Sequence, residues 1–346
     1  MSAGSSDHES NTMSPPEELR RLFELMGGYR VTQALYVAAK LGIADLLAGG
    51  PNTANDLAAA TGANSDALYR LLRMLANIGV FEEAADRQFT LTPMATLLQQ
   101  DHPYSLRAQA LLFGGDGYRA FGGLLHTVMT GETAFNHVFG AGHFAYLAEH
   151  PEESAIFSQA MSASSRRVVP AIVGAYYFSS AQTVADIGGG QGMLLGAVLR
   201  ANLTLRGILF DEAHVVAMAE PVLAAAGIAD RCACVAGDFF AAVPPGADIY
   251  MLRHIVHDWD DECSVAILRN CAEAAGTGGK VLVIESIVEP GNGFSTVKML
   301  DVQMLVMNGG RERTAEEYRQ LFTAAGLALT RIIPAGAESL IEGERA

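Results

Sequence analysis

The residues best suited to chemistry lie close together at positions 251–262, which read MLRHIVHDWDDE. The stretch holds two histidines, the single tryptophan of the chain and four acidic residues. A neutral imidazole can accept a proton near neutral pH, and a nearby carboxylate can stabilise the imidazolium that forms. A histidine at the end of a strand is more often a structural hydrogen-bonding group, and we interpret His254 in this way. For His257, a structural role of this kind competes with a role in proton transfer.

A second candidate site is the glycine cluster DIGGGQG at residues 186–192. It follows an apolar run and precedes a helical stretch, and its glycines would let a ligand approach the backbone closely. The dinucleotide fingerprint G-x-G-x-x-G would require glycine at position 193 or 195, where the chain has Met193 and Leu195. A pyrophosphate is therefore not the expected ligand, whereas a sulfonium with an amino-acid tail and a ribose is compatible.

Acidic residues end three successive predicted strands, namely Asp186, Asp211 and Asp238. Ligands of open α/β sheets bind outside the carboxyl ends of the strands. Asp211 could accept hydrogen bonds from ribose hydroxyls, while Asp238 and Phe239 could contact the amino group and the face of an adenine. Each acid could instead cap a helix or begin a turn.

The elements that must position these groups change in character near residue 179. From residue 182 onward, short apolar runs alternate with helical stretches, which is typical of a parallel sheet covered by helices. We therefore expect a Rossmann-like α/β domain over residues 179–346. Its seven predicted strands are 183–187, 207–210, 232–236, 249–252, 280–287, 327–333 and 339–342.

The first half of the chain predicts three further parts. Residues 1–14 are small and polar and predict a disordered tail. Residues 15–100 predict a mainly helical winged-helix domain. Residues 101–178 predict helices broken at glycine-rich points, and we expect this linker region to contribute to a substrate pocket.

The winged-helix prediction rests on turn and cap residues. Thr53 and Ser65 are suited to cap two short helices, and Gly62 lies in the turn between them. Residues 79–83 and 87–92 then alternate like two strands around a polar turn. Together these elements indicate a helix-turn-helix followed by a wing.

A winged helix is often a DNA-binding module, so a transcriptional regulator is an alternative function. In the candidate recognition helix only Arg70 and Arg73 could reach a groove, and apolar residues occupy much of the rest. The formal charge of −15 also disfavours a surface that follows phosphates. We expect this domain to pack against protein, without a nucleic-acid partner.

The composition favours a cytoplasmic dimer. Half of the residues are hydrophobic and only 18% are charged, which indicates that a second subunit covers some of the surface. The four cysteines lack the spacing of a zinc site or a disulfide framework. We find no signal peptide and no apolar stretch that could span a bilayer, and we expect no membrane attachment.

Three stretches together resemble the bacterial branch of the small-molecule O-methyltransferase family, which includes plant caffeate and isoflavone enzymes and hydroxyindole O-methyltransferase. They are DIGGGQG at 186–192, LRHIVHDW at 252–259 and GGRERT at 309–314. The resemblance extends from about Pro15 to the C-terminus. It implies S-adenosylmethionine (SAM) as cofactor, S-adenosylhomocysteine (SAH) as product and an aromatic secondary metabolite as acceptor. The N-terminal helices and the low charge content predict a homodimer formed through the N-terminal domain.

The resemblance also implies the catalytic residues. His257, the histidine of the His-Asp-Trp stretch, would be the general base, and Glu285 and Glu312 would be its partners. A phenol is a poor nucleophile until its proton is removed, which gives the base its task. The methyl carbon is already activated by the positive sulfur, so only in-line positioning remains and no metal is implied.

Ligand contacts follow from the resemblance position by position. The implied cofactor-binding residues are Ser165, Asp186, Gly188, Gly190, Asp211, Asp238, Phe239 and Arg253. The implied acceptor-binding residues are Phe157, Met161, Asp258, Met304 and Asn308. Met161 and Met304 would hold a flat ring between two polarizable sulfurs, although core packing is a simpler explanation for either methionine.

Two departures from the family pattern affect these expectations. Residues 210–213 read FDEA where many relatives have FDLP, and Asn308 stands where bacterial relatives often have Thr. Asn308 therefore weakens any transfer of acceptor identity. A relative that binds the cofactor but performs other chemistry, such as hydroxylation, is a second hypothesis, against which the presence of His257, Glu285 and Glu312 argues.

Overall fold

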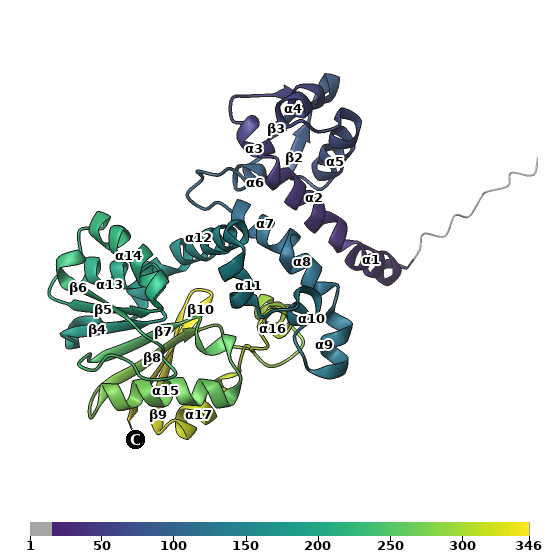
Figure 1. Ribbon diagram of the computed structural model, residues 1–346. Helices are drawn as coiled ribbons and strands as arrows, with labels where there is room; N and C mark the ends of the chain where they lie inside the picture. The colour runs from purple at the N-terminus through teal and green to yellow at the C-terminus, as the bar shows by residue number, and fades with distance from the viewer. Residues whose placement is uncertain (1–15, 346) are drawn as a thin grey trace, which may run out of the picture. The chain divides into compact units, whose positions relative to one another are not determined.

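The computed structural model describes residues 16–345, so the tail expected at residues 1–14 lies outside the described residues. Two compact units make up the described chain (Figure 1). The first ends at His102 and the second begins at Pro103.

The first unit consists of helices and a small antiparallel sheet. Strand β3 lies between β1 and β2 and pairs with both. The wing therefore has a third strand that the sequence did not indicate, since β1 is only two residues long. The elements are α1 (Glu17–Met26), α2 (Gly28–Lys40), α3 (Ile43–Leu46), β1 (Asn52–Thr53), α4 (Ala54–Thr61), α5 (Ser65–Asn77), β2 (Phe81–Glu83), η1 (Ala85–Arg87), β3 (Gln88–Leu91) and α6 (Pro93–Thr96).

One of the two predicted helix caps is wrong. The Thr53 side chain accepts a hydrogen bond from the backbone N–H of Asp56 and caps α4 as expected. The cap of α5, however, is Asn64, whose side chain accepts a hydrogen bond from the backbone N–H of Ala67. Ser65 is the first helical residue, and its hydroxyl donates to the Asn55 side chain instead. Asn and Ser are almost equally good caps, so adjacent candidates cannot be separated by residue type.

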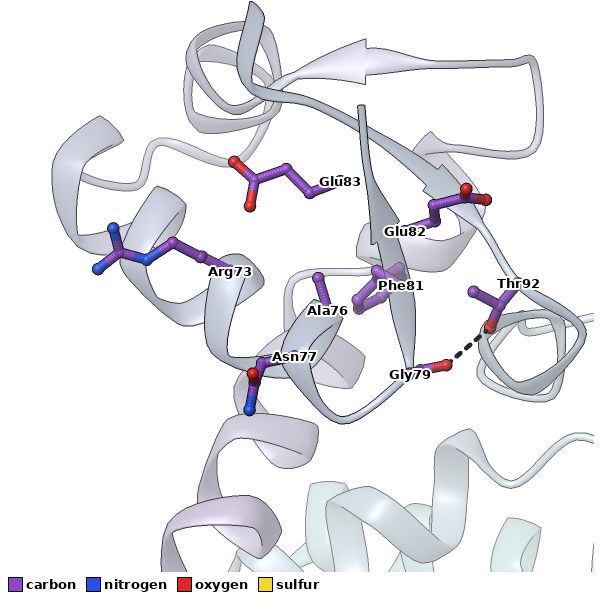
Figure 2. Close-up of a pocket in the computed structure, with 8 residues that line it drawn as sticks. All are labelled: Arg73, Ala76, Asn77, Gly79, Phe81, Glu82, Glu83 and Thr92. Carbon is purple, nitrogen blue, oxygen red and sulfur yellow. Dashed lines mark hydrogen bonds between the residues drawn. The ribbon is translucent and has the colours of Figure 1, made fainter. Parts of the chain in front are cut away.

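An open groove of about 570 Å³ lies between α5 and the wing (Figure 2). Its lining residues are Arg73, Ala76, Asn77, Gly79, Phe81, Glu82, Glu83 and Thr92. The Thr92 hydroxyl donates to the carbonyl of Gly79 and joins the end of β3 to the start of the wing. The groove brings one arginine and two carboxylates together but holds neither a histidine nor a cysteine.

The second unit begins with a run of helices. They are α7 (Arg107–Gly114), α8 (Asp116–Phe121), α9 (Leu124–Thr130), α10 (Ala134–Phe139), α11 (His143–Glu149) and α12 (Pro151–Ala175), followed by η2 (Phe178–Ser180). Gly115, Gly122 and Gly140 follow the last residues of α7, α8 and α10, so the predicted glycine breaks coincide with observed helix ends.

A seven-stranded sheet follows, in the order β6-β5-β4-β7-β8-β10-β9 (Figure 1). All neighbours are parallel except β10, which runs antiparallel to both β8 and β9. The strands are β4 (Thr183–Ile187), β5 (Arg206–Asp211), β6 (Cys232–Ala236), β7 (Ile249–Arg253), β8 (Lys280–Glu285), β9 (Leu327–Ala335) and β10 (Glu338–Arg345). Strand β8, which was predicted to extend to residue 287, ends two residues earlier at Glu285.

Helices cover both faces of this sheet. They are α13 (Met193–Ala201), α14 (Ala213–Ala225), α15 (Asp261–Ala275) and α17 (Ala315–Ala324), with η3 (Ala229–Arg231) and η4 (Val256–Asp258) as short turns. Neighbouring residues of one strand enter opposite cores. Val184 packs with α12, α13 and α14, whereas Ala185 packs with α15 and α17. This alternation is the period of a strand that is buried on both faces.

Helix α16 (Thr296–Met307) belongs to a different layer. It packs against α8, α9 and α10 and contributes Val306 and Met307 to their shared core. The loop after α16 leads back to the sheet, where Ile287 forms a single parallel bridge with Arg313. The helical layer is thus tied to the carboxyl ends of the central strands.

Candidate active site

The glycine cluster forms the turn between β4 and α13. Gly188 has a φ of 66°, and a Cβ at this position would lie 2.3 Å from Cδ1 of Ile255. Only glycine avoids both the unfavourable backbone region and this clash. The backbone N–H of Gly190 donates to Oδ2 of Asp211 at 2.8 Å, so the loop is fixed to the end of β5.

Asp186 lies beneath this loop at the end of β4. It is 2% exposed, and burial raises the pKa of its carboxyl to about 7, against the weaker opposing effect of a backbone hydrogen bond from Leu195. Its Oδ2 is buried and has no hydrogen-bond partner among the described residues. A buried carboxylate oxygen without a partner is costly, so this atom indicates a place where a donor group of a ligand could bind.

The other two predicted strand-end acids follow β5 and β6. Oδ1 of Asp211 accepts from the backbone N–H of Glu212 at 2.8 Å, while burial raises the pKa of this carboxyl. Asp238 is exposed, and its Oδ1 accepts from the N–H of Phe240 at 2.8 Å. Phe239 lies edge-to-face with Trp259 at 6.1 Å between ring centroids. These contacts place an acid and an aromatic ring at the same edge of the sheet as the glycine loop.

Arg253 ends β7 in a network that the sequence did not reveal. Its Nε and Nη2 donate to Glu338 at 2.9 and 2.6 Å, and its Nη1 donates to Oγ of Ser165 at 2.9 Å. Burial alone would raise the pKa of Glu338, but the hydrogen bonds from His254 and Arg253 outweigh it and lower that pKa to about 2. The predicted cofactor residues Arg253 and Ser165 are therefore in direct contact, held by a buried carboxylate.

His254 confirms the structural interpretation. Its Nε2 lies 3.0 Å from Oε1 of Glu338, and its backbone has a φ of 55°, which is uncommon for a side chain with a Cβ. The ring stacks on His257 with 4.9 Å between centroids. His254 thus fills the space behind the candidate base.

His257 lies in η4, between two buried carboxylates. Its Nδ1 is 2.7 Å from Oε1 of Glu312 and 3.5 Å from Oε2 of Glu285. Glu285 also accepts hydrogen bonds from the backbone N–H groups of Ile255 and His257, at 3.1 and 3.3 Å. Because the carboxylates occupy the Nδ1 side, the hydrogen-bonding geometry leaves Nε2 as the nitrogen that can accept a proton.

The electrostatics of this cluster strengthen the base. Burial on its own would lower the pKa of His257, but the charge of Glu285 and the hydrogen bond to Glu312 outweigh it and raise the pKa to about 10. Burial also raises the pKa of Glu285. The three side chains have ligand-type atoms within 4.8 Å of one another, so they are also the set among residues 16–345 that could hold a metal ion. The absence of a metal requirement stays a prediction.

Three residues of the GGRERT segment hold His257 in place. A Cβ at Gly310 would lie 2.0 Å from the carbonyl oxygen of His257, so the backbones approach more closely than any other residue allows. The fully buried Arg313 donates to the carbonyl oxygens of Val256 and Trp259 at 3.0 and 2.9 Å. The backbone N–H of Glu312 donates to Oδ1 of Asp301 on α16 at 2.9 Å. The segment therefore fixes both the loop of His257 and the carboxylate that holds its ring.

The predicted acceptor residues fall into two groups. Asp258 and Asn308 lie beside the base, with Oδ1 of Asp258 at 3.7 Å from Nε2 of His257 and at 2.7 Å from Nδ2 of Asn308. Met304 is buried on α16, while Phe157 and Met161 lie on α12, where Met161 is 37% exposed. That the two methionines hold a ring between them stays a prediction.

Three residues that contact predicted site residues were not predicted from the sequence: Glu338, Asp301 and His143. Glu338 immediately precedes the last predicted strand, and a single acid at that place does not indicate that Arg253 is its partner. His143 contacts Asn308 through its Nδ1 at 3.0 Å, across 165 residues of chain. Each of the three is a charged or imidazole group within an otherwise apolar segment. This pattern indicates a buried side chain that has a partner, but it does not identify the partner.

Comparison with known proteins agrees with this geometry. The chain matches the O-methyltransferase domain over residues 121–328 and the O-methyltransferase dimerisation domain over residues 23–101. Phenazine O-methyltransferase PhzM of Lysobacter antibioticus is 48% identical over 322 residues, which cover 93% of this chain and 94% of that protein.

Solved structures show the same relationship. The crystal structure of LaPhzM matches with a TM-score of 0.91 and 47% identity, covering 95% of this chain and 99% of that one. NcsB1, an O-methyltransferase from neocarzinostatin biosynthesis solved with SAM and 2-hydroxy-5-methyl naphthoic acid, matches with a TM-score of 0.83 and 36% identity, covering 92% and 96% of the two chains.

The fold, the glycine loop and these matches define a SAM-dependent methyltransferase. This chain belongs to the O-methyltransferase family, in which bacterial enzymes of aromatic secondary metabolism are its relatives, and it carries that family's N-terminal dimerisation domain. The predictions of the family, the fold class, the enzyme class and the cofactor are confirmed.

Proposed function

We propose that this enzyme transfers a methyl group from SAM to a hydroxyl of an aromatic small molecule, with His257 as the general base. One observation carries the assignment of the base. Nδ1 of His257 is held at 2.7 Å by Glu312, with Glu285 beside it, so the ring has one defined orientation and its Nε2 lies on the side away from these two carboxylates. A base oriented by a buried carboxylate is the arrangement that removes a proton from a weakly acidic hydroxyl.

The residues of the glycine loop fit the cofactor. Gly188 and Gly190 keep the loop free of side chains, and the partnerless Oδ2 of Asp186 could accept from a cationic amino group. Asp211, Asp238 and Phe239 lie at the next two strand ends, where a ribose and an adenine could bind. Arg253 and Ser165 would serve the carboxylate of the amino-acid tail. When bound, SAM supplies a methyl group on a positive sulfur, already activated toward a nucleophile.

The side chains around His257 prepare it to receive a proton. The pKa of His257 is raised toward the ordinary pKa of a phenol, which is about 10, and this favours proton transfer from a phenol to the imidazole. Glu312 and Glu285 stabilise the resulting imidazolium because they lie on its Nδ1 side. His257 is 7% exposed, so the ring is largely shielded from bulk water.

An aromatic acceptor is supported by the relatives. PhzM is named as a phenazine O-methyltransferase, and NcsB1 was solved with a naphthoic acid. In this chain Phe157, Met161 and Met304 would contact the ring, and Asp258 and Asn308 its polar substituents. The alternative of hydroxylation has no specific observation in its favour, since His257, Glu285 and Glu312 are assembled as a base requires.

Methyl transfer is tested by incubating the protein with SAM carrying a deuterated methyl group and a panel of hydroxylated naphthalenes and phenazines. We expect products heavier by one labelled methyl, with fragmentation that places the label on oxygen. A complete absence of labelled products, together with normal binding of SAH, would contradict the proposed function.

We further propose that the winged-helix unit does not bind nucleic acid. Arg73 and Arg87 both lie over the ring of Tyr69, at 5.4 and 4.4 Å from its centroid, rather than extending as free cations. Glu82 and Glu83 form the wing strand beside Arg73 (Figure 2). Carboxylates on a wing would repel the phosphates that a wing normally contacts.

We propose that the first unit forms a homodimer instead, in the cytoplasm. Helix α1 exposes apolar side chains that a partner subunit would cover, as the matched dimerisation domain suggests. All four cysteines are free thiols, which suits a reducing compartment. Within residues 16–345, none of the helices combines the length and apolar character needed to cross a membrane.

A further inference from the structure

Glu338 is a buried acid at the edge of the sheet where the candidate cofactor residues lie. It is 4% exposed and is the first residue of β10, which lies beside β8 (Figure 1). The next residue, Ser339, pairs with Glu285, the last residue of β8. Glu338 therefore lies where the parallel strands end, which is the edge at which open α/β sheets bind ligands.

The carboxylate of Glu338 fixes the plane of a guanidinium. Its Oε2 accepts from Nε of Arg253 at 2.9 Å and its Oε1 accepts from Nη2 at 2.6 Å. Two parallel hydrogen bonds between a carboxylate and an arginine define the orientation of both groups, which one bond does not. Nε2 of His254 lies 3.0 Å from the same Oε1 and holds the carboxylate from a second side.

The hydrogen bonds of Arg253 leave part of its guanidinium available. Of the five N–H groups of an arginine, two donate to Glu338 and one donates from Nη1 to Oγ of Ser165 at 2.9 Å. One N–H on Nη1 and one on Nη2 have no partner among residues 16–345. The side chain of Arg253 is only 11% exposed, so these two N–H groups are donors that a bound ligand could satisfy.

An acid and an arginine lie on adjacent strands at this edge. Asp186, whose Oδ2 is buried and has no partner among the described residues, pairs in register with Met251, and Arg253 follows two residues later on β7. One strand end thus offers an acceptor and its neighbour offers two donors. This arrangement matches the ammonium and the carboxylate of an amino-acid tail.

We propose that Glu338 is a positioning residue for the amino-acid tail of the cofactor, because it fixes Arg253 with two N–H groups left to donate to the tail's carboxylate. This inference rests on the proposed function, in which Arg253 serves that carboxylate. Charge alone would have the opposite effect, since Glu338 neutralises the arginine and repels a second carboxylate. The sign of the effect of removing Glu338 therefore separates positioning from charge.

The test measures binding to the whole protein by calorimetry, with two probes. SAH carries the amino-acid tail, whereas 5′-methylthioadenosine has the same nucleoside and a thioether but lacks the tail. In Glu338→Gln we expect the dissociation constant of SAH to increase by about 10- to 100-fold, because the amide nitrogen is a donor and cannot accept from Arg253. That of 5′-methylthioadenosine should change by less than about threefold. A merely structural role of Glu338 would weaken both probes alike.

A second variant keeps the charge and changes the position. Glu338→Asp shortens the side chain by one methylene group, and we expect it to weaken SAH by about three- to tenfold, again with little effect on 5′-methylthioadenosine. This variant also carries the test if Glu338→Gln fails to fold.

Glu342→Gln is the matched control. Glu342 is a buried acid of the same strand, 2% exposed, and accepts from Nε and Nη2 of Arg331 at 2.9 Å each. Its substitution removes a paired carboxylate from β10 without touching Arg253, so the ratio of the two dissociation constants should stay unchanged.

Two results would overturn the proposal. One is binding of SAH by Glu338→Gln that is as tight as, or tighter than, its binding by the unmodified protein. The other is an equal loss of affinity for both probes in the Glu338 variants. Failure of the proposed function would differ, because the unmodified protein would then bind SAH with the expected dependence on Glu338 but transfer no labelled methyl.

Discussion

His257 meets two requirements that normally conflict. A general base must be accessible to its substrate, yet its strength here comes from burial beside Glu285 and Glu312, whose charges raise the pKa of the imidazole to about 10. The conflict is resolved by the two ring nitrogens, because Glu285 and Glu312 occupy the Nδ1 side while Nε2 lies on the side of Asp258. This arrangement suits the role proposed for His257, removal of a proton from a phenol.

A pH profile follows from this residue. Below a pKa of about 10 most of His257 is protonated, and only the neutral imidazole can accept the acceptor's proton. We therefore expect kcat/KM to increase by about tenfold per pH unit between about pH 7 and pH 9, since the neutral fraction increases by that factor. Initial rates with 2-naphthol measure it. A flat profile over this range would show that the free enzyme does not hold His257 protonated.

At the scale of elements, the position of the base depends on a segment distant in sequence. The loop between α16 and α17 approaches η4 so closely that Gly310 contacts the carbonyl of His257, and Arg313 binds two further carbonyls of the same loop. The backbone of His257 is thus positioned by these contacts and its ring by the side chain of Glu312.

Gly310→Ala tests this arrangement. Its Cβ would lie 2.0 Å from the His257 oxygen, so the loop must shift, which should cost about 1–3 kcal/mol of stability and lower kcat by about 10- to 100-fold. Thermal unfolding and steady-state rates provide the two readouts. Gly293→Ala, where a Cβ meets nothing within 4 Å, is the control and should leave both unchanged. Unchanged kcat in Gly310→Ala would show that the close approach does not position the base.

The sequence predicted most elements because hydrophobic periodicity is a local signal. The seven strands of the sheet and the glycine breaks between helices follow from such patterns, whereas β1 has only two residues and forms through its pairing with β3. Strand 280–287 ends early at Glu285, where the carboxylate turns to His257. Adjacent cap candidates at Asn64 and Ser65 were not distinguishable by type.

The candidate site could be predicted where motifs mark it and not elsewhere. His257, Glu285 and Glu312 are brought together as expected, since each lies within or beside a recognisable stretch. Glu338 and His143 were missed because their roles come from partners far along the chain, Arg253 and Asn308. Contacts of this kind depend on strand order and helix packing, which residue types alone do not specify.

At the scale of the whole molecule, the exposed face of α1 requires a partner. Leu19, Leu22 and Phe23 are 54–64% exposed on one helix, and we expect a dimer in sedimentation velocity at micromolar concentration. The double substitution Leu22→Asp, Phe23→Asp should produce monomers, because it places charges in the apolar face. Leu203→Asp is the control, since that leucine is at least as exposed and lies outside the dimerisation domain. A monomeric unmodified protein would contradict the proposed dimer.

The acidic character of the whole chain leads us to predict that it does not bind nucleic acid. With a formal charge of −15 and carboxylates on the wing, we expect no shift of genomic DNA fragments in gels at physiological salt. A shift that weakens with increasing salt and is lost in Arg70→Ala, Arg73→Ala would instead show a DNA-binding surface on α5.

The central claim is that His257 removes the acceptor's proton, and the most direct measurement is single-turnover methyl transfer by His257→Gln. We expect SAH binding by calorimetry to be unchanged, because His257 is not among the proposed cofactor contacts, while the rate of methyl transfer falls by about 10²–10⁴-fold. The variant should also lose the increase of rate with pH that the imidazole causes. Methyl transfer at the full rate by His257→Gln would contradict the claim and leave positioning alone to account for catalysis.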